Sequence, residues 1–310
     1  MHPTTEPLRP SYAILVAISA VGPLALNIFM PSMPGLQAEF GVSYGVVQLT
    51  LTLYLIGMAA CQLVYGPISD KVGRRPMLLF GMALFVVASV MAALAPSIEV
   101  LIVARLLQAV GGAAGVVLAR AMVRDVFDRE TSASVISYIT MAFVVAPMVA
   151  PAIGGYIDTH GGWRMGFWLL SALGGLVLAA SWVSLPETHV NRLGGNGLGL
   201  ISGAVRLFGL RRFRGYTLVL AFTSSVFFAF LGGAPHIMMD VLGRTPMEYG
   251  LWFITVPAGY MAGDLLSRRY TRSVGLDSMI MAGCVITLAG GPLFLRGGGE
   301  GGASPPPPVP

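Results

Sequence analysis

The chain has 310 residues, of which 55% are hydrophobic and only 11% are charged. An ordinary soluble domain carries about 25% charged residues, so a water-soluble fold of this length is excluded because its surface would be too apolar. The formal charge of +5 falls mainly in short segments between apolar runs, where it indicates membrane orientation rather than a nucleic-acid partner.

Apolar runs of about 20 residues have the length of a helix that crosses a bilayer. Their continuity argues against the alternating strands of a membrane β-barrel, and the first run lacks the cleavage site of a signal peptide. The sequence therefore predicts an all-α polytopic membrane protein with nine spans. Their approximate ranges are 11–31, 43–67, 76–95, 98–123, 133–157, 163–184, 216–240, 247–266 and 277–295.

Loop lengths divide the chain into four parts. Short loops join the first six spans, so residues 1–185 are expected to form an N-terminal six-helix bundle. Residues 186–215 form a basic cytoplasmic linker, whose second half is either an interfacial helix on an anionic leaflet or a basic loop. Residues 216–295 are expected to supply about three helices of a second bundle, and residues 296–310 form a low-complexity tail rich in glycine and proline.

The basic residues set the expected orientation. With the N-terminus in the cytoplasm, most of the 19 Lys and Arg residues fall in cytoplasmic segments, whereas the outer loops carry only Arg164 and Arg244. Cytoplasmic loops of membrane proteins collect Lys and Arg. We therefore expect a multi-pass protein of the plasma membrane with its N-terminus in the cytoplasm.

The turn between spans two and three, GPISDKVGRRP, gathers four charged side chains between two apolar runs. Glycine permits close approach and unusual backbone angles, and an acid among cations can hold two helix bundles together in one state and release them in another. The alternative is ordinary positive-inside charge, which explains the cations but not the acid or the glycines. The residues of this expected latch are Gly66, Asp70, Lys71, Gly73, Arg74 and Arg75.

Span four contains an arginine within an apolar helix. Arg105 and Gln108 lie at i and i+3 and share one helical face. A buried guanidinium is costly in lipid and is expected to face a polar cavity or a partner. The alternative is an arginine that extends to the outer membrane interface.

Span five, AFVVAPMVAPAIGGYI, carries two neighbouring stripes of small residues and prolines. Prolines kink a helix, and small residues let helices approach closely. The alternative is a kinked helix with a structural role alone. The residues singled out are Pro147, Pro151, Gly154 and Gly155.

These three patterns together resemble the major facilitator superfamily. The turn after span two matches G-x-x-x-D-R-x-G-R-R/K except that Lys71 replaces an arginine, and span four resembles R-x-x-Q-G with Ala109 in place of the glycine. Span five resembles the antiporter signature G-x-x-x-G-P-x-x-G-G, which is associated with exporters. The segments LNIFMPSMPGL, MVRD and WRMGFWLLS further resemble the bicyclomycin-resistance (Bcr/CflA) group of drug exporters.

The resemblance implies a fold of twelve helices in two six-helix bundles, of which this chain supplies nine, so it resembles a C-terminally truncated member. It also implies export of small amphipathic drugs or metabolites by alternating access, in exchange for protons, from a bacterial inner membrane. The subgroup often has an acid in span one where this chain has Asn27. An uncoupled uniporter or importer, and a truncated chain without transport activity, therefore stay open as alternatives.

The expected partners are a small-molecule substrate, protons and the lipid bilayer. Candidate residues for the transport cavity are Asn27, Tyr54, Arg105, Gln108, Tyr138 and Met141. Cys61 and Cys284 lie inside apolar runs and indicate neither a disulfide nor a metal site. A phosphate-binding G-x-x-x-x-G-K-[ST] loop is absent from the sequence, so we expect no enzymatic activity and no cofactor.

The topology can be tested with single cysteines at Asn196 and Ser304, in a chain whose two native cysteines are replaced. We expect a membrane-impermeant thiol reagent to label intact cells at Ser304 but not at Asn196, because nine spans place the linker inside and the tail outside. The reverse pattern would contradict this topology.

Overall fold

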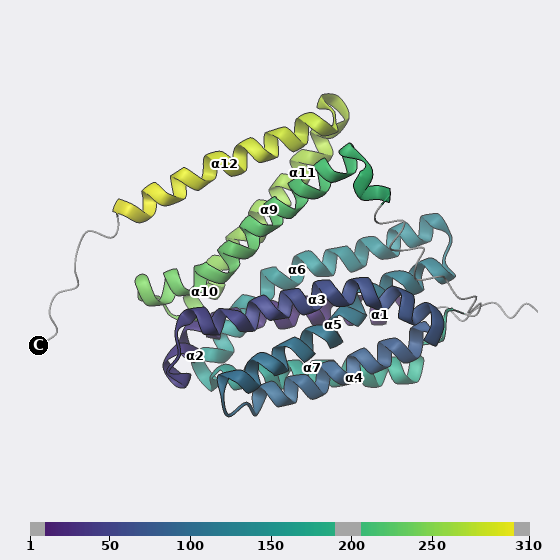
Figure 1. Cartoon of the computed structure of the whole chain (residues 1–310), viewed down its shortest axis with the longest axis horizontal. Coiled ribbons are helices and arrows are strands. Elements are labelled where there is room, and N and C mark those ends of the chain that lie inside the picture. Colours follow the sequence, from purple (N-terminus) through teal and green to yellow (C-terminus); the bar gives the residue numbers. More distant parts are fainter. Residues whose placement is uncertain (1–9, 190–205, 301–310) are drawn as a thin grey trace, which may run out of the picture. The chain divides into compact units, whose positions relative to one another are not determined.

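The computed structural model describes residues 10–189 and 206–300 of the chain. Within these residues the chain is helical and contains no strand (Figure 1). Clustering of the backbone divides the chain into two compact units, Met1–Pro257 and Ala258–Pro310. Each unit is described separately below.

Six long helices form the first bundle, as expected for the N-terminal part. They run between two ends, one that holds the short helix α2 (the α2 end) and one that holds the turn at Gly73 (the Gly73 end) (Figure 1). The elements of this bundle are α1 (Tyr12–Ile28), η1 (Met30–Ser32), α2 (Met33–Phe40), α3 (Tyr44–Val72), α4 (Arg74–Ala93), α5 (Ile98–Val126), α6 (Arg129–Gly161) and α7 (Trp163–Ser184).

The second part of the chain begins with α9 (Arg211–His236), the π-helical turn η2 (Ile237–Val241) and α10 (Pro246–Phe253), which belong to the same unit as the first bundle. Next come α11 (Thr255–Val274) and α12 (Leu276–Glu300). Residues 190–205 of the expected linker and residues 301–310 of the expected tail lie outside the described residues. α12 continues past the expected end of the last span at residue 295.

Seven helices of the described residues are long and apolar enough to cross a membrane, whereas nine spans were expected. The expected eighth span, 247–266, is divided between α10 and α11, and the expected ninth span, 277–295, lies within α12. The reason that α11 is not apolar enough to span a membrane is chemical, because α11 carries the sequence GDLLSRRYTRSV. Its charges interrupt the hydrophobic run that a spanning helix needs.

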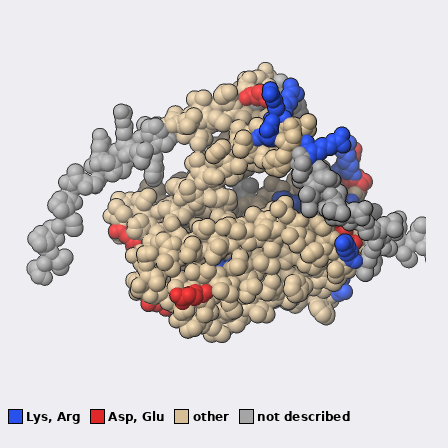
Figure 2. Space-filling view, in the orientation of Figure 1, with Lys and Arg blue, Asp and Glu red and all other residues tan. Residues whose placement is uncertain are grey.

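The bundle exterior fits a lipid environment. Figure 2 shows that the long sides of the helices facing the viewer are almost free of charge, and that the charged residues lie near helix ends. Large apolar side chains of the bundle, such as Leu63 of α3 and Val183 of α7, are exposed. Exposed apolar surface of this extent marks a membrane-facing protein rather than a soluble one.

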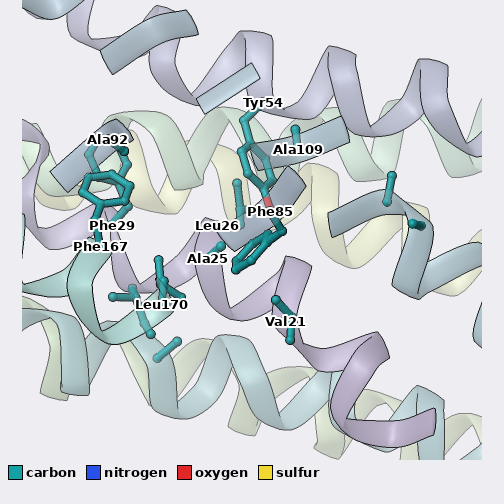
Figure 3. Packing of buried hydrophobic residues seen from close by; sticks show 14 of the residues in the cluster. Val21, Ala25, Leu26, Phe29, Tyr54, Phe85, Ala92, Ala109, Phe167 and Leu170 are labelled. Carbon is teal, nitrogen blue, oxygen red and sulfur yellow. The ribbon is translucent and has the colours of Figure 1, made fainter. Parts of the chain in front are cut away.

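The helix α5 lies at the centre of the bundle and touches α1, α3, α4 and α6. Its glycines make this possible, because a Cβ atom at Gly111 would lie 2.5 Å from the backbone nitrogen of Phe85, and one at Gly115 would lie 2.3 Å from the carbonyl oxygen of Ile18. Around these contacts, side chains from α1, α3, α4 and α7 converge on a buried apolar core (Figure 3).

The turn before α6 is fixed by a polar cap. The side chain of Asp128 accepts hydrogen bonds from the backbone N–H groups of Glu130 and Thr131. Hydrogen bonds from the side chain and backbone of Thr131 hold the pKa of Asp128 below its usual range. The carboxylate therefore stays charged and satisfies the first free N–H groups of the helix.

Substitution of Gly111 by alanine tests the central contact. We expect Gly111→Ala to destabilise the protein by about 1–3 kcal/mol, the usual cost of overpacking, because the added methyl group meets backbone atoms. Gly175→Ala in α7 is the matched control, since a Cβ there has nothing within 4 Å. Thermal unfolding in detergent measures both, and equal melting temperatures for the two variants would contradict the close approach of α4 and α5.

Candidate functional site

Arg105 in the middle of α5 is fully buried, with none of its surface exposed. Its Nη1 atom donates hydrogen bonds to the carbonyl oxygen of Ala25 at 3.1 Å and to Oε1 of Gln108 at 2.6 Å. Arg105 and Gln108, which were expected to share one helical face, are in direct contact. The alternative of an arginine that extends to the membrane interface does not fit this burial.

Aromatic rings surround the guanidinium group. Its central carbon lies 4.2 Å from the ring centroid of Tyr54, 4.6 Å from that of Phe29 and 5.8 Å from that of Phe167. Ring faces carry negative electrostatic potential and attract a desolvated cation. The three rings come from α3, α1 and α7, so the charge connects four helices.

Two hydrogen-bonded branches extend from this centre. Gln108 donates through Nε2 to Oγ of Ser89 at 2.8 Å, and Ser89 donates to the carbonyl oxygen of Phe85 at 2.7 Å. The hydroxyl of Tyr54 donates to the carbonyl oxygen of Gly22 at 2.9 Å. Arg105, Gln108, Ser89, Tyr54, Phe29 and Phe167 together form what we call the arginine cluster.

The arginine cluster keeps unused polar capacity. In the part of the chain that the structure describes, Nε and Nη2 of Arg105 are buried without a hydrogen-bond partner. The described carboxylates form their ion pairs elsewhere. Unpaired buried polar groups are costly, so these atoms are available to a water molecule or a polar group of a substrate.

The other predicted cavity residues lie apart from this cluster. Asn27 is buried but donates its side-chain N–H to the carbonyl oxygen of Pro23 on its own helix. Tyr138 and Met141 are exposed on α6. The structure therefore brings together three of the six candidates, Tyr54, Arg105 and Gln108, and adds Ser89, Phe29 and Phe167, which the sequence did not single out.

A small cleft adjoins the arginine cluster at Phe29 and Phe167, between α1, α6 and α7. Its cavity volume is about 10 Å³, which is room for about one water molecule. A drug-sized substrate therefore does not fit inside this cleft as described.

Arg74 is the centre of the predicted latch. Its Nη1 atom lies 2.6 Å from Oδ1 of Asp70, and its Nε atom lies 3.0 Å from Oδ2 of Asp125. Gly73 has a φ of +111°, an angle that side chains strongly disfavour, which explains the glycine between α3 and α4. Lys71 is exposed, and a Cβ at Gly66 would meet nothing within 4 Å.

Glu187 holds the start of α4 from the far end of α7. Its carboxylate accepts hydrogen bonds from the backbone N–H groups of Arg74 at 3.0 Å and Arg75 at 3.2 Å. A carboxylate at a helix N-terminus is favoured by both the free N–H groups and the helix dipole. The guanidinium of Arg75 in turn donates to the carbonyl oxygen of Trp182 at 2.7 Å.

The described contacts of the latch residues thus join helices of the first bundle, although we expected a connection between two bundles. A contact with the second bundle stays a prediction for another state of the protein. The sequence reasoning missed Asp125 and Glu187. Their signal was that each is an acid near the end of an apolar run, at the basic end of the bundle, in a chain with only 14 acidic residues.

The small residues of α6 contact two different helices. A Cβ at Gly154 would lie 2.1 Å from the carbonyl oxygen of Ile28 in α1, and one at Gly155 would lie 2.2 Å from that of Pro246 in α10. A Cβ at Gly250 of α10 would in turn lie 2.5 Å from the carbonyl oxygen of Pro151. Pro147 also lies within α6. This stripe therefore brings the first bundle into backbone contact with α10.

Residues 15–308 match the family model described as Major Facilitator Superfamily. The chain belongs to the Major Facilitator Superfamily. It is 35% identical over 258 residues to multidrug resistance protein D of Escherichia coli, covering 82% of this chain and 64% of that protein. It is 33% identical over 288 residues to a chloramphenicol resistance protein of Pseudomonas aeruginosa, covering 93% of this chain and 68% of that protein.

Solved transporters share the superfamily fold. A bacterial homolog of the human lysosomal transporter Spinster, in an inward-facing and unoccupied conformation, matches with a TM-score of 0.67 at 20% identity, over 84% of this chain and 63% of that one. A D-xylose–proton symporter matches with a TM-score of 0.63 at 14% identity, over 85% of this chain and 69% of that one. The chain spans about two thirds of the length of the relatives it matches.

Replacement of Arg105 by lysine tests the arginine cluster. Lysine keeps the charge but lacks the planar fork that reaches Ala25 and Gln108 while lying over aromatic rings. We expect Arg105→Lys to lower stability by about 1.5–3 kcal/mol, the value of hydrogen bonds to a charged group. Arg124→Lys, at an exposed position of the same helix, is the control. Thermal unfolding in detergent that leaves the Arg105→Lys variant as stable as the control would contradict a structural role for the guanidinium geometry.

Proposed function

We propose that this superfamily member exports small amphipathic drugs or metabolites from the cytoplasm in exchange for protons. The observation that carries the proposal is the identity of 33–35% to proteins named for multidrug and chloramphenicol resistance. The apolar exterior and the hydrogen-bonded arginine cluster fit a transporter and do not indicate an enzyme. No cofactor is required for this function.

In this proposal, Arg105 supplies a fixed positive charge and free N–H donors in the membrane interior. Nε and Nη2 are the donors that a polar group of the substrate would use. The aromatic rings of Tyr54, Phe29 and Phe167 hold the guanidinium in place. Because the neighbouring cleft is small, we place the drug-sized cavity between the two helix bundles, as alternating access requires.

We propose that the Gly73 end faces the cytoplasm, because cytoplasmic loops collect Lys and Arg and the latch cations lie there. In the described unit, α3 touches α9 and α6 touches α10 at the α2 end. This supports a state that is closed at the outer face. The bacterial Spinster homolog, which has the higher TM-score of the two solved transporters described above, is likewise in an inward-facing conformation.

The alternative of uncoupled transport is favoured by Asn27. An amide does not exchange a proton with solvent as a carboxylate does, and no described carboxylate forms an ion pair with Arg105. Proton exchange, where it occurs, therefore uses groups other than residue 27. A second alternative is a chain that does not transport alone, because the chain covers 64% of multidrug resistance protein D and α9 exposes large apolar side chains such as Leu220 and Phe222.

An efflux assay tests the proposal. In cells that lack other exporters, at matched membrane expression, we expect this chain to lower accumulation of chloramphenicol or a cationic dye if it forms a working exporter, and Arg105→Ala to abolish the effect. Sensitivity to an uncoupler would support proton exchange, whereas efflux that only follows the substrate gradient would support uncoupled transport. Accumulation equal to that in cells with an empty vector would support the inactive-chain alternative.

A further inference from the structure

Two helices of different bundles meet at the α2 end of the first unit. Tyr44 at the start of α3 donates its hydroxyl to the carbonyl oxygen of Gly232 in α9 at 3.0 Å. Gln48, one turn further along α3, donates through Nε2 to the same oxygen at 3.2 Å. One backbone carbonyl thus accepts two side-chain hydrogen bonds from the opposite bundle. We call this the α3–α9 contact.

A histidine adds an ionisable group to the α3–α9 contact. The imidazole of His236 in α9 lies against the ring of Tyr44, with centroids 4.7 Å apart and an interplanar angle of 31°. Its Nδ1 atom lies 2.6 Å from Oδ2 of Asp240. The imidazole is therefore placed between an aromatic ring of one bundle and a carboxylate of the other.

The local backbone favours this arrangement. Residues Ile237–Val241, which include Asp240, form a π-helical turn, a rare conformation that often occurs at functional sites. Asp240 is four residues after His236 and pairs with it on the same face of the turn. The side chains of both residues keep about 40% of their surface exposed, at 42% and 39%, so protons reach the pair from the aqueous phase.

We propose that His236 is a proton-binding site that controls the α3–α9 contact. A protonated imidazole forms an ion pair with Asp240 and presents a cation to the ring of Tyr44. A neutral imidazole carries no charge, so both its attraction to the carboxylate of Asp240 and its attraction to the ring of Tyr44 are weaker. Closure at the α2 end therefore binds a proton at His236, and lower pH at this face stabilises the closed state.

The other charged groups near the contact have partners of their own. Glu39 of α2 pairs with Arg164, and Glu248 of α10 pairs with Arg244. Tyr249 of α10 is buried beside the contact. Histidine is the side-chain type whose ordinary charge change falls between about pH 5 and 8, whereas carboxylates and phenols ordinarily change charge outside that range. The stabilisation of the closed state is thus present at low pH and lost as the pH rises.

The chain contains a matched control for this histidine. His160 at the α2 end of α6 lies against Tyr156, with ring centroids 4.3 Å apart, and its Nδ1 atom is 2.8 Å from the carbonyl oxygen of Tyr156. This second histidine–tyrosine pair lies entirely within one helix. His160 therefore has a similar aromatic neighbour, but adding a proton to it does not alter a contact between the two bundles.

The experiment measures distances between spin labels on the two sides of the contact, in the 310-residue chain reconstituted in lipid nanodiscs. Labels are placed at Ser43→Cys and Val241→Cys, both exposed positions, after Cys61→Ala and Cys284→Ala. We expect the ratio of short to long distances to rise about two- to fivefold from pH 8 to pH 5.5, the range for an exposed contact between a cation and an aromatic ring, because the ring of Tyr44 is the part of this arrangement that lies across the contact. His236→Gln should remove this dependence, Asp240→Asn should reduce it, and His160→Gln should leave it unchanged.

A ratio that does not depend on pH, or one that depends on pH equally in the His236→Gln protein, would overturn the proposal. Loss of the dependence in His160→Gln would also overturn it, because it would assign the effect to α6. Asp240→Asn supplies an independent readout if His236→Gln folds poorly. The measurement needs no substrate and no transport, so its outcome is separate from that of the proposed export function.

Discussion

The first bundle is organised around one buried positive charge. A guanidinium in an apolar interior is stable only where the protein supplies partners that replace water, and for Arg105 these partners come from α1, α3, α5 and α7. The carbonyl oxygen of Ala25 and the rings of Phe29, Tyr54 and Phe167 fix the positions of α1, α3 and α7 relative to α5, and Gln108 supplies a partner from α5 itself. The glycines of α5 are the steric counterpart, because they let α1 and α4 come close enough for these contacts.

The two ends of the bundle are held in different ways. At the Gly73 end, Arg74 forms ion pairs with Asp70 and Asp125, and Glu187 caps α4 from α7. These contacts join helices within one bundle. At the α2 end, Tyr44 and the glycines of α6 instead meet α9 and α10. The first bundle is therefore internally fixed at one end and touches the second part of the chain at the other.

Hydrophobic length and local motifs were enough to predict the helical fold, the superfamily and the pairing of Arg105 with Gln108, because these features depend on residues that are close in sequence. Phe29, Phe167 and Ser89 were not predicted, since only packing decides which aromatic or hydroxyl side chain faces α5. The same limit applied to Glu187, whose partners at residues 74 and 75 lie far away in sequence. The eighth span was expected to be continuous because residues 247–266 contain only two charged residues, whereas the break between α10 and α11 is a property of the folded backbone.

The contact between α6 and α10 has a mechanical consequence. At Gly155 and Gly250 each helix presents bare backbone to the other, so neither of these residues inserts a side chain between the two helices. Separating interdigitated side chains requires rotamer changes and leaves voids, whereas two smooth surfaces part or slide as rigid bodies. At this position the helices slide past each other without rotamer changes. The polar contacts beside them, rather than side-chain packing, therefore set the barrier to their relative movement.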